Sequence, residues 1–137
     1  MPYDLDRFVT AQDREYETVL GELRRGRKST HWIWFIFPQI AGLGHSAMSQ
    51  HFAIGSLDEA RAYLAHPVLG ARLRECARLV LAVEGRSAEE ILGSTDAMKL
   101  RSSMTLFHRA APDQAEFALV LDRYYLGLED PATTARL

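Results

Sequence analysis

The residues best suited to chemistry lie in a short polar stretch, residues 99–105. Lys99, Ser102 and Ser103 are spaced i, i+3 and i+4, which places them on one face of a helix. An ammonium group beside two hydroxyl groups can hold a phosphate or a carboxylate, and Arg101 on a neighbouring face adds a second cation. A structural role fits equally well, because the hydroxyls could bond to carbonyls one turn earlier. The spacing leaves both interpretations open.

A second candidate is the aromatic segment, residues 31–39, with the sequence HWIWFIFPQ. The indoles of Trp32 and Trp34 offer faces on which a planar ligand could stack, and the amides of Gln39 and Gln12 could orient it. A run this apolar cannot face water, so the alternative is that both indoles belong to the core.

Together these two stretches predict a pocket for an anionic, nucleotide-like small molecule. Its candidate ligand-binding residues are Gln12, His31, Trp32, Trp34, Gln39, Lys99, Arg101, Ser102 and Ser103. The alternative is a protein-interaction module without catalytic activity, in which a residual apolar patch binds a partner or a second copy of the chain.

The remaining reactive side chains give no clear catalytic set. His31 could be a general base or a satisfied imidazole. The five histidines show no close ligand spacing, so no metal site and no cofactor are expected. Cys76 lies on an apolar stripe and is expected to be buried. Because Asp96, Glu59 and Glu90 read as helix caps, no carboxylate pair is left for acid–base work, and catalysis stays an open question.

Two further stretches could bind an anion but have ordinary explanations. The turn at residues 42–46 (GLGHS) could cradle an anion on its N–H groups, but without a preceding strand a plain tight turn is more common. The basic residues 24–28 could steer a phosphate or could be a solvated helix end.

Composition limits the class of protein. The chain has 137 residues, of which 47% are hydrophobic, and its net charge is −2. These values predict a single domain over residues 1–137 and argue against nucleic acid as the main partner. One cysteine allows no internal disulfide, and no segment resembles a secretory signal or a membrane span. The chain is therefore expected to be cytoplasmic, with its oligomeric state open.

The elements that must position these residues are helices. Apolar periodicity and helix-stop residues predict a compact all-α bundle of about seven short helices. The first helix is expected to begin at Asp4 and to end at Gly26, and Ser56–Glu59 and Ser87–Glu90 read as capping boxes. The aromatic segment has strand-like composition but no partner strand, which favours a short helix capped by Thr30 and ended by Pro38.

Several strings resemble one family, the bacterial and fungal domain of unknown function 1810. They are HWIWFIFPQ (31–39), GLG (42–44), HPVLG (66–70), KLRSSMTLF (99–107) and the early FVxAQ (8–12). The resemblance covers about residues 4–137 and implies a small all-α fold, but no reaction. Some members carry the label calpastatin, a protease inhibitor. Inhibitors of that type are disordered and poor in apolar residues, whereas this chain is built to fold.

Overall fold

The computed structural model describes residues 3–137, and that part of the chain forms nine α-helices. They are α1 (Asp6–Arg25), α2 (Ile33–Ile36), α3 (Ala47–His51), α4 (Leu57–Ala65), α5 (Leu69–Ala82), α6 (Ala88–Leu92), α7 (Ser94–Ala110), α8 (Ala115–Tyr125) and α9 (Pro131–Thr134). The all-α prediction is confirmed. The number exceeds the predicted seven because α2, α3, α6 and α9 have only four or five residues each.

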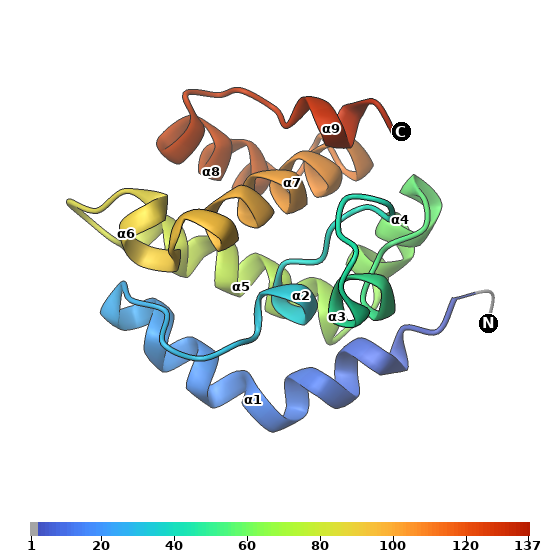
Figure 1. Cartoon of the computed structure of the whole chain (residues 1–137), viewed down its shortest axis with the longest axis horizontal. Coiled ribbons are helices and arrows are strands. Elements are labelled where there is room, and N and C mark those ends of the chain that lie inside the picture. The colour runs from blue at the N-terminus through green and yellow to red at the C-terminus, as the bar shows by residue number, and fades with distance from the viewer. Residues whose placement is uncertain (1–2) are drawn as a thin grey trace.

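The helices are arranged around α5 and α7 (Figure 1). Helix α1 lies along one side of the molecule and packs on α5, while α8 and α9 lie on the opposite side against α7. The apolar stripe of α1 places Phe8, Val19 and Leu23 in the core with no exposed surface. Gly26 ends α1 in the left-handed conformation with φ 69°, as the sequence predicts.

Two of the predicted helix starts are shifted. The residue before α1 is Leu5 rather than Asp4, and it makes no side-chain cap. Helix α7 begins at Ser94, two residues before the expected cap, so Asp96 lies in the first turn. There its carboxylate forms an ion pair with Lys28 at 2.8 Å instead of capping the helix. A partner distant in sequence has therefore replaced the local cap.

Of the two predicted capping boxes, one is complete and the other is only half formed. Ser87 and Glu90 form the complete reciprocal box at α6. Ser56 accepts a hydrogen bond from the Glu59 N–H, but the Glu59 carboxylate accepts from the Gly55 N–H rather than from that of Ser56. The other oxygen of Glu59 pairs with Arg7 at 3.2 Å, which draws this side chain away from the reciprocal position.

The aromatic segment is helical, but the helix is short. Helix α2 covers only residues 33–36, and it stops at Phe37 before the proline. Thr30 does not cap it, because the Thr30 hydroxyl donates to the carboxylate of Glu22 at 2.7 Å. The only extended pairing within residues 3–137 is a single parallel bridge between Ile40 and Ile54, just after this segment.

Candidate functional site

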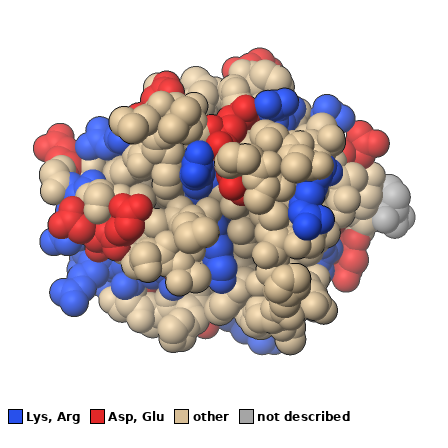
Figure 2. Space-filling view, turned by 45° about the horizontal axis from the view of Figure 1, so that its top comes forward, with Lys and Arg blue, Asp and Glu red and all other residues tan. Residues whose placement is uncertain are grey.

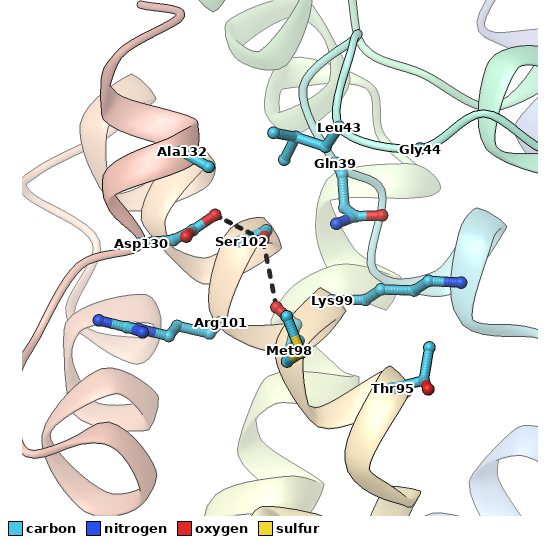
Figure 3. Close-up of a pocket in the computed structure, with 10 residues that line it drawn as sticks. All are labelled: Gln39, Leu43, Gly44, Thr95, Met98, Lys99, Arg101, Ser102, Asp130 and Ala132. Carbon is cyan, nitrogen blue, oxygen red and sulfur yellow. Dashed lines mark hydrogen bonds between the residues drawn. The ribbon is translucent and has the colours of Figure 1, made fainter.

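A cavity of about 260 Å³ lies between the loop at residues 39–44, helix α7 and the segment that enters α9. We call it the α7 cavity. The residues that line it are Gln39, Leu43, Gly44, Thr95, Met98, Lys99, Arg101, Ser102, Asp130 and Ala132 (Figure 3). Three segments far apart in the sequence therefore meet here, and each contributes polar groups.

Lys99 supplies one of the two cations that line this cavity. Its Nζ atom lies 5.0 Å from the centroid of the Trp34 ring, and its side chain extends toward α2 (Figure 3). Within the described residues, Lys99 has no ion-pair partner. Trp34 is partly buried, and its indole N–H is enclosed without a hydrogen-bond acceptor. An ammonium over an indole keeps its charge available for a further partner.

Arg101, the second cation, is already engaged. Its Nε donates to the carbonyl of Leu128 at 2.9 Å, and its Nη2 donates to the carbonyl of Glu129 at 2.8 Å. Figure 3 shows its side chain extending away from Lys99. Arg101 thus ties the segment after α8 to α7, and that segment forms one wall of the cavity.

Asp130 completes this wall, although its sequence context predicts only a cap for the short helix α9. Its Oδ2 atom accepts from the hydroxyls of Ser102 at 2.7 Å and of Thr133 at 2.6 Å. Its N–H donates to the Thr105 hydroxyl at 2.9 Å. Burial by itself raises the pKa of Asp130, but the hydrogen bonds from Thr133 and Ser102 lower it by a larger amount. The pKa of this carboxyl group therefore lies below its usual value. No local pattern could link residues that lie 28 positions apart.

The opposite wall is the loop after the aromatic segment. The Ile54 N–H donates to the Gln39 carbonyl at 2.9 Å, and the Ala41 N–H donates to the Ile54 carbonyl at 2.8 Å. Gly42 follows with φ 97°, and a Cβ at this position would overlap the guanidinium of Arg136. The turn seen in the sequence is therefore a fixed backbone wall that contacts the C-terminal segment.

Three of the nine candidate residues lie in the core rather than at the cavity. The Gln12 amide donates to the Phe35 carbonyl at 2.6 Å and to the Tyr63 hydroxyl at 3.0 Å. Trp32 has no exposed surface. Ser103 is equally buried, and its hydroxyl has no hydrogen-bond partner.

The remaining candidates divide between two places. Gln39, Lys99, Arg101 and Ser102 line the α7 cavity, and Trp34 lies beneath Lys99. His31 is exposed and lines a separate, more open depression beside the start of α7. The structure thus brings the polar stretch that begins at Lys99 to the end of the aromatic segment, whereas the beginning of that segment lies beside the first turn of α7.

Glu22 explains the burial of Trp32, and sequence reasoning missed it. This carboxylate is 2% exposed and accepts hydrogen bonds from the N–H groups of Ser29 and Thr30, the Thr30 hydroxyl and the Trp32 indole. Burial raises the pKa of Glu22, but these donors outweigh it and hold the pKa at about 2. The carboxylate therefore stays ionised and anchors the turn before α2.

Charge on the surface is mixed. Figure 2 shows basic and acidic side chains interspersed over one face of the molecule, without a broad expanse of either sign. Residues 3–137 hold no group of three or more side chains suited to binding a metal ion. Over the same residues, no helix combines the length and the apolar character needed to cross a bilayer.

Comparison with known proteins gives a family but no activity. The family model described as "Protein of unknown function (DUF1810)" matches residues 2–137. The chain is 53% identical to the conserved hypothetical protein Rv1873 from Mycobacterium tuberculosis, whose crystal structure it matches with a TM-score of 0.98 over 100% of this chain and 98% of that one. No functionally curated protein matches the chain.

Proposed function

The chain belongs to the DUF1810 family, and from this premise and the geometry above we propose that the α7 cavity binds a small anionic molecule through Lys99. One observation carries the proposal. The cavity presents an ammonium group that no carboxylate of residues 3–137 neutralises, whereas its other cation, Arg101, is engaged by two carbonyls.

The chain contains a built-in comparison, because it has only two lysines. Lys28 lies over Trp32 just as Lys99 lies over Trp34, at 5.0 Å in each case. Lys28, however, pairs with Asp96 at 2.8 Å, and its side chain is only 7% exposed. The contrast separates a lysine that stabilises the fold from one that is available to a ligand.

The size of the cavity narrows the class of ligand. Pockets for drug-sized ligands measure roughly 300–1,000 Å³. At about 260 Å³ the α7 cavity is slightly smaller. It suits a phosphate group with part of a sugar or a base, and it is too small to enclose a dinucleotide.

The carboxylate in the cavity favours binding over acid–base catalysis. Asp130 already accepts two hydroxyl hydrogen bonds, and its lowered pKa makes it a weak base near neutral pH. Gln39 and Thr95 add uncharged hydrogen-bonding groups around Lys99, whereas the Ser102 hydroxyl is already donated to Asp130. Such a set orients a polar anion without supplying an obvious proton acceptor.

Lysine acylation tests the proposal directly. The protein is treated with a limiting amine-reactive ester in potassium phosphate, in adenosine 5′-monophosphate, or in potassium chloride of equal ionic strength. Peptide mass spectrometry then gives the acylation rate of each lysine. Binding slows acylation of Lys99 at least fivefold and leaves that of Lys28 unchanged. Equal rates for Lys99 in all three solutions would refute the proposal.

A protein-interaction role is the second candidate, and exposed apolar side chains favour it. Leu126 is 87% exposed, Leu128 is 58% exposed and Met98 is 72% exposed. The Tyr125 hydroxyl donates to the Ala97 carbonyl, and Arg101 donates to the Leu128 carbonyl, so the three apolar side chains lie on neighbouring stretches. Light scattering distinguishes the candidates: a strict monomer across the micromolar range speaks against self-association through this surface.

A further inference from the structure

A second cavity adjoins the first. It has a volume of about 330 Å³ and lies between the loop at residues 39–44 and helix α3. Gln39 and Gly44 line both cavities, so the loop separates them only in part. One molecule of sufficient length could therefore contact both.

The second cavity has a different chemical character. Besides the shared Gln39, its polar side chains are those of His45, Ser49 and Gln50, and no Lys, Arg, Asp or Glu lines it. The Gln50 amide nitrogen donates to the His45 carbonyl at 3.1 Å, which leaves the amide oxygen as an acceptor. Such a surface suits a neutral group with hydroxyls or ring nitrogens rather than a second anion.

The backbone of the shared loop adds hydrogen-bonding groups. Among residues 3–137, no acceptor takes the N–H groups of Gly42, Leu43 or Gly44. A Cβ at Gly44 would overlap the hydroxyl oxygen of Ser49, so the absence of a side chain keeps this end of the loop thin. The partition between the cavities thus consists of backbone that can itself contact a ligand.

We propose, resting on the function proposed above, that the two cavities hold one organic phosphate monoester. Its phosphate lies at Lys99, and its neutral, hydrogen-bonding body passes Gln39 and Gly44 to reach Ser49 and Gln50. The α7 cavity alone is slightly below the range for small-molecule sites and the second cavity is at its lower end, whereas the two together fall well inside it. The occupant is therefore a sugar phosphate or a nucleoside monophosphate rather than inorganic phosphate.

Dissociation constants from NMR titration test whether the phosphate and the neutral body of one ligand occupy the two cavities. The probes are inorganic phosphate, glucose 6-phosphate and adenosine 5′-monophosphate. At least one monoester is expected to bind tenfold or more tightly than inorganic phosphate, which corresponds to about 1.4 kcal/mol. Lys99→Gln weakens the binding of every probe, whereas Arg14→Gln, which removes an exposed charge on α1, does not.

Two variants isolate the second cavity. Gln50→Leu and Ser49→Ala, at two positions that line the second cavity but not the α7 cavity, are expected to abolish the advantage of the monoester and to leave the affinity for inorganic phosphate unchanged. Gln114→Leu is the matched control, since Gln114 lines neither cavity. Thermal unfolding confirms that each variant is folded; Gln50 is exposed, so its replacement leaves the core intact.

The two proposals fail in different ways. If phosphate protects Lys99 but neither monoester binds more tightly, or if Gln50→Leu and Ser49→Ala leave the monoester affinity unchanged, the shared-occupant inference is wrong and the α7 site remains. If none of the three probes binds, both proposals are overturned.

Discussion

Lys99 and Trp34 form an ammonium–indole pair with 5.0 Å between Nζ and the ring centroid, and the pair stands at the edge of a cavity. The arrangement repeats that of Lys28 and Trp32, except that Lys28 is buried beside a carboxylate. The same local contact therefore occurs in two environments, and we propose that only Lys99 is available to a ligand.

Replacement of the two lysines is expected to affect stability unequally. Lys99→Gln removes a partly exposed cation–π contact and lowers the free energy of unfolding by about 0.5–1 kcal/mol. Lys28→Gln also removes the ion pair with Asp96, whose side chain is 18% exposed, and costs about 2 kcal/mol. Urea denaturation of both variants provides the measurement. Equal losses would contradict the assignment of Lys28 to the fold.

Glu22 is expected to make stability depend on pH in acid. Its pKa is about 2 in the folded chain, against an ordinary value of 4.5. Since the folded pKa is depressed, the stabilisation is complete above about pH 4.5 and is lost as the pH falls toward 2. It amounts to on the order of 3 kcal/mol, because each unit of pKa shift is worth about 1.4 kcal/mol.

The variant Glu22→Gln checks this dependence. At pH 6 the variant is expected to be less stable by about 2–3 kcal/mol, because it loses charge-assisted hydrogen bonds. The difference from the natural chain should shrink as the pH is lowered from 5 to 3, as measured by urea unfolding at each pH. A difference that stays constant over that range would show that Glu22 does not titrate as proposed.

Leu126 offers a stabilising substitution. It ends α8 in the left-handed conformation at φ 57°, and its side chain is 87% exposed, so it makes little packing contact there. This conformation costs roughly 1–2 kcal/mol for residues with a Cβ, and glycine avoids that cost. Leu126→Gly should raise the free energy of unfolding by about 1 kcal/mol relative to Leu126→Ala, measured by thermal or chemical denaturation. The alanine variant controls for the lost side chain.

Replacement of Gln12 is expected to lower stability, whereas replacement of Gln39 is expected to weaken ligand binding. Gln12→Leu leaves the Phe35 carbonyl and the Tyr63 hydroxyl without their donor, which costs about 2 kcal/mol of stability. It should not change the protection of Lys99 by phosphate. Gln39→Leu should weaken that protection with little effect on stability, because Gln39 is partly exposed at the cavity. Acylation rates of Lys99 and urea unfolding curves are measured for both variants. Equal effects of the two substitutions on both quantities would contradict this prediction.

Features that depend on neighbouring residues could be predicted from the sequence. The apolar stripe of α1, its stop at Gly26 and the capping box of Ser87 with Glu90 all follow from residues within a few positions of one another. The family resemblance also named the fold class correctly. Local chemistry thus sufficed for most of the helices.

Features that depend on distant partners could not be predicted. The sequence predicts that Asp96 and Thr30 cap helices. Instead, the Asp96 carboxylate forms an ion pair with Lys28, and the Thr30 hydroxyl donates a hydrogen bond to Glu22. Asp130 lies at the cavity wall because it accepts a hydrogen bond from Ser102, although the whole of helix α8 separates the two residues in the sequence. A sequence pattern gives the donors and acceptors that a residue carries, but not which of them the fold brings together.

The candidate face of α7 illustrates the limit within a single helix. Residues at i+3 and i+4 lie on either side of residue i and are themselves about 100° apart around the axis. Relative to Lys99, Ser102 therefore turns toward the cavity and Ser103 toward the core, where it is completely buried. The spacing could place both serines near Lys99, but only the packing of α7 could tell which one reaches the cavity.

The carboxylate of Glu22 also fixes the alignment of the aromatic segment. Residues 32–37 are all apolar, so hydrophobicity alone does not distinguish one position of this segment from the next. Only one register brings an indole N–H and the two preceding main-chain N–H groups to the same carboxylate. A slip would leave an anion unsolvated inside the protein, so a single acidic side chain decides which tryptophan is interior and which one borders the solvent.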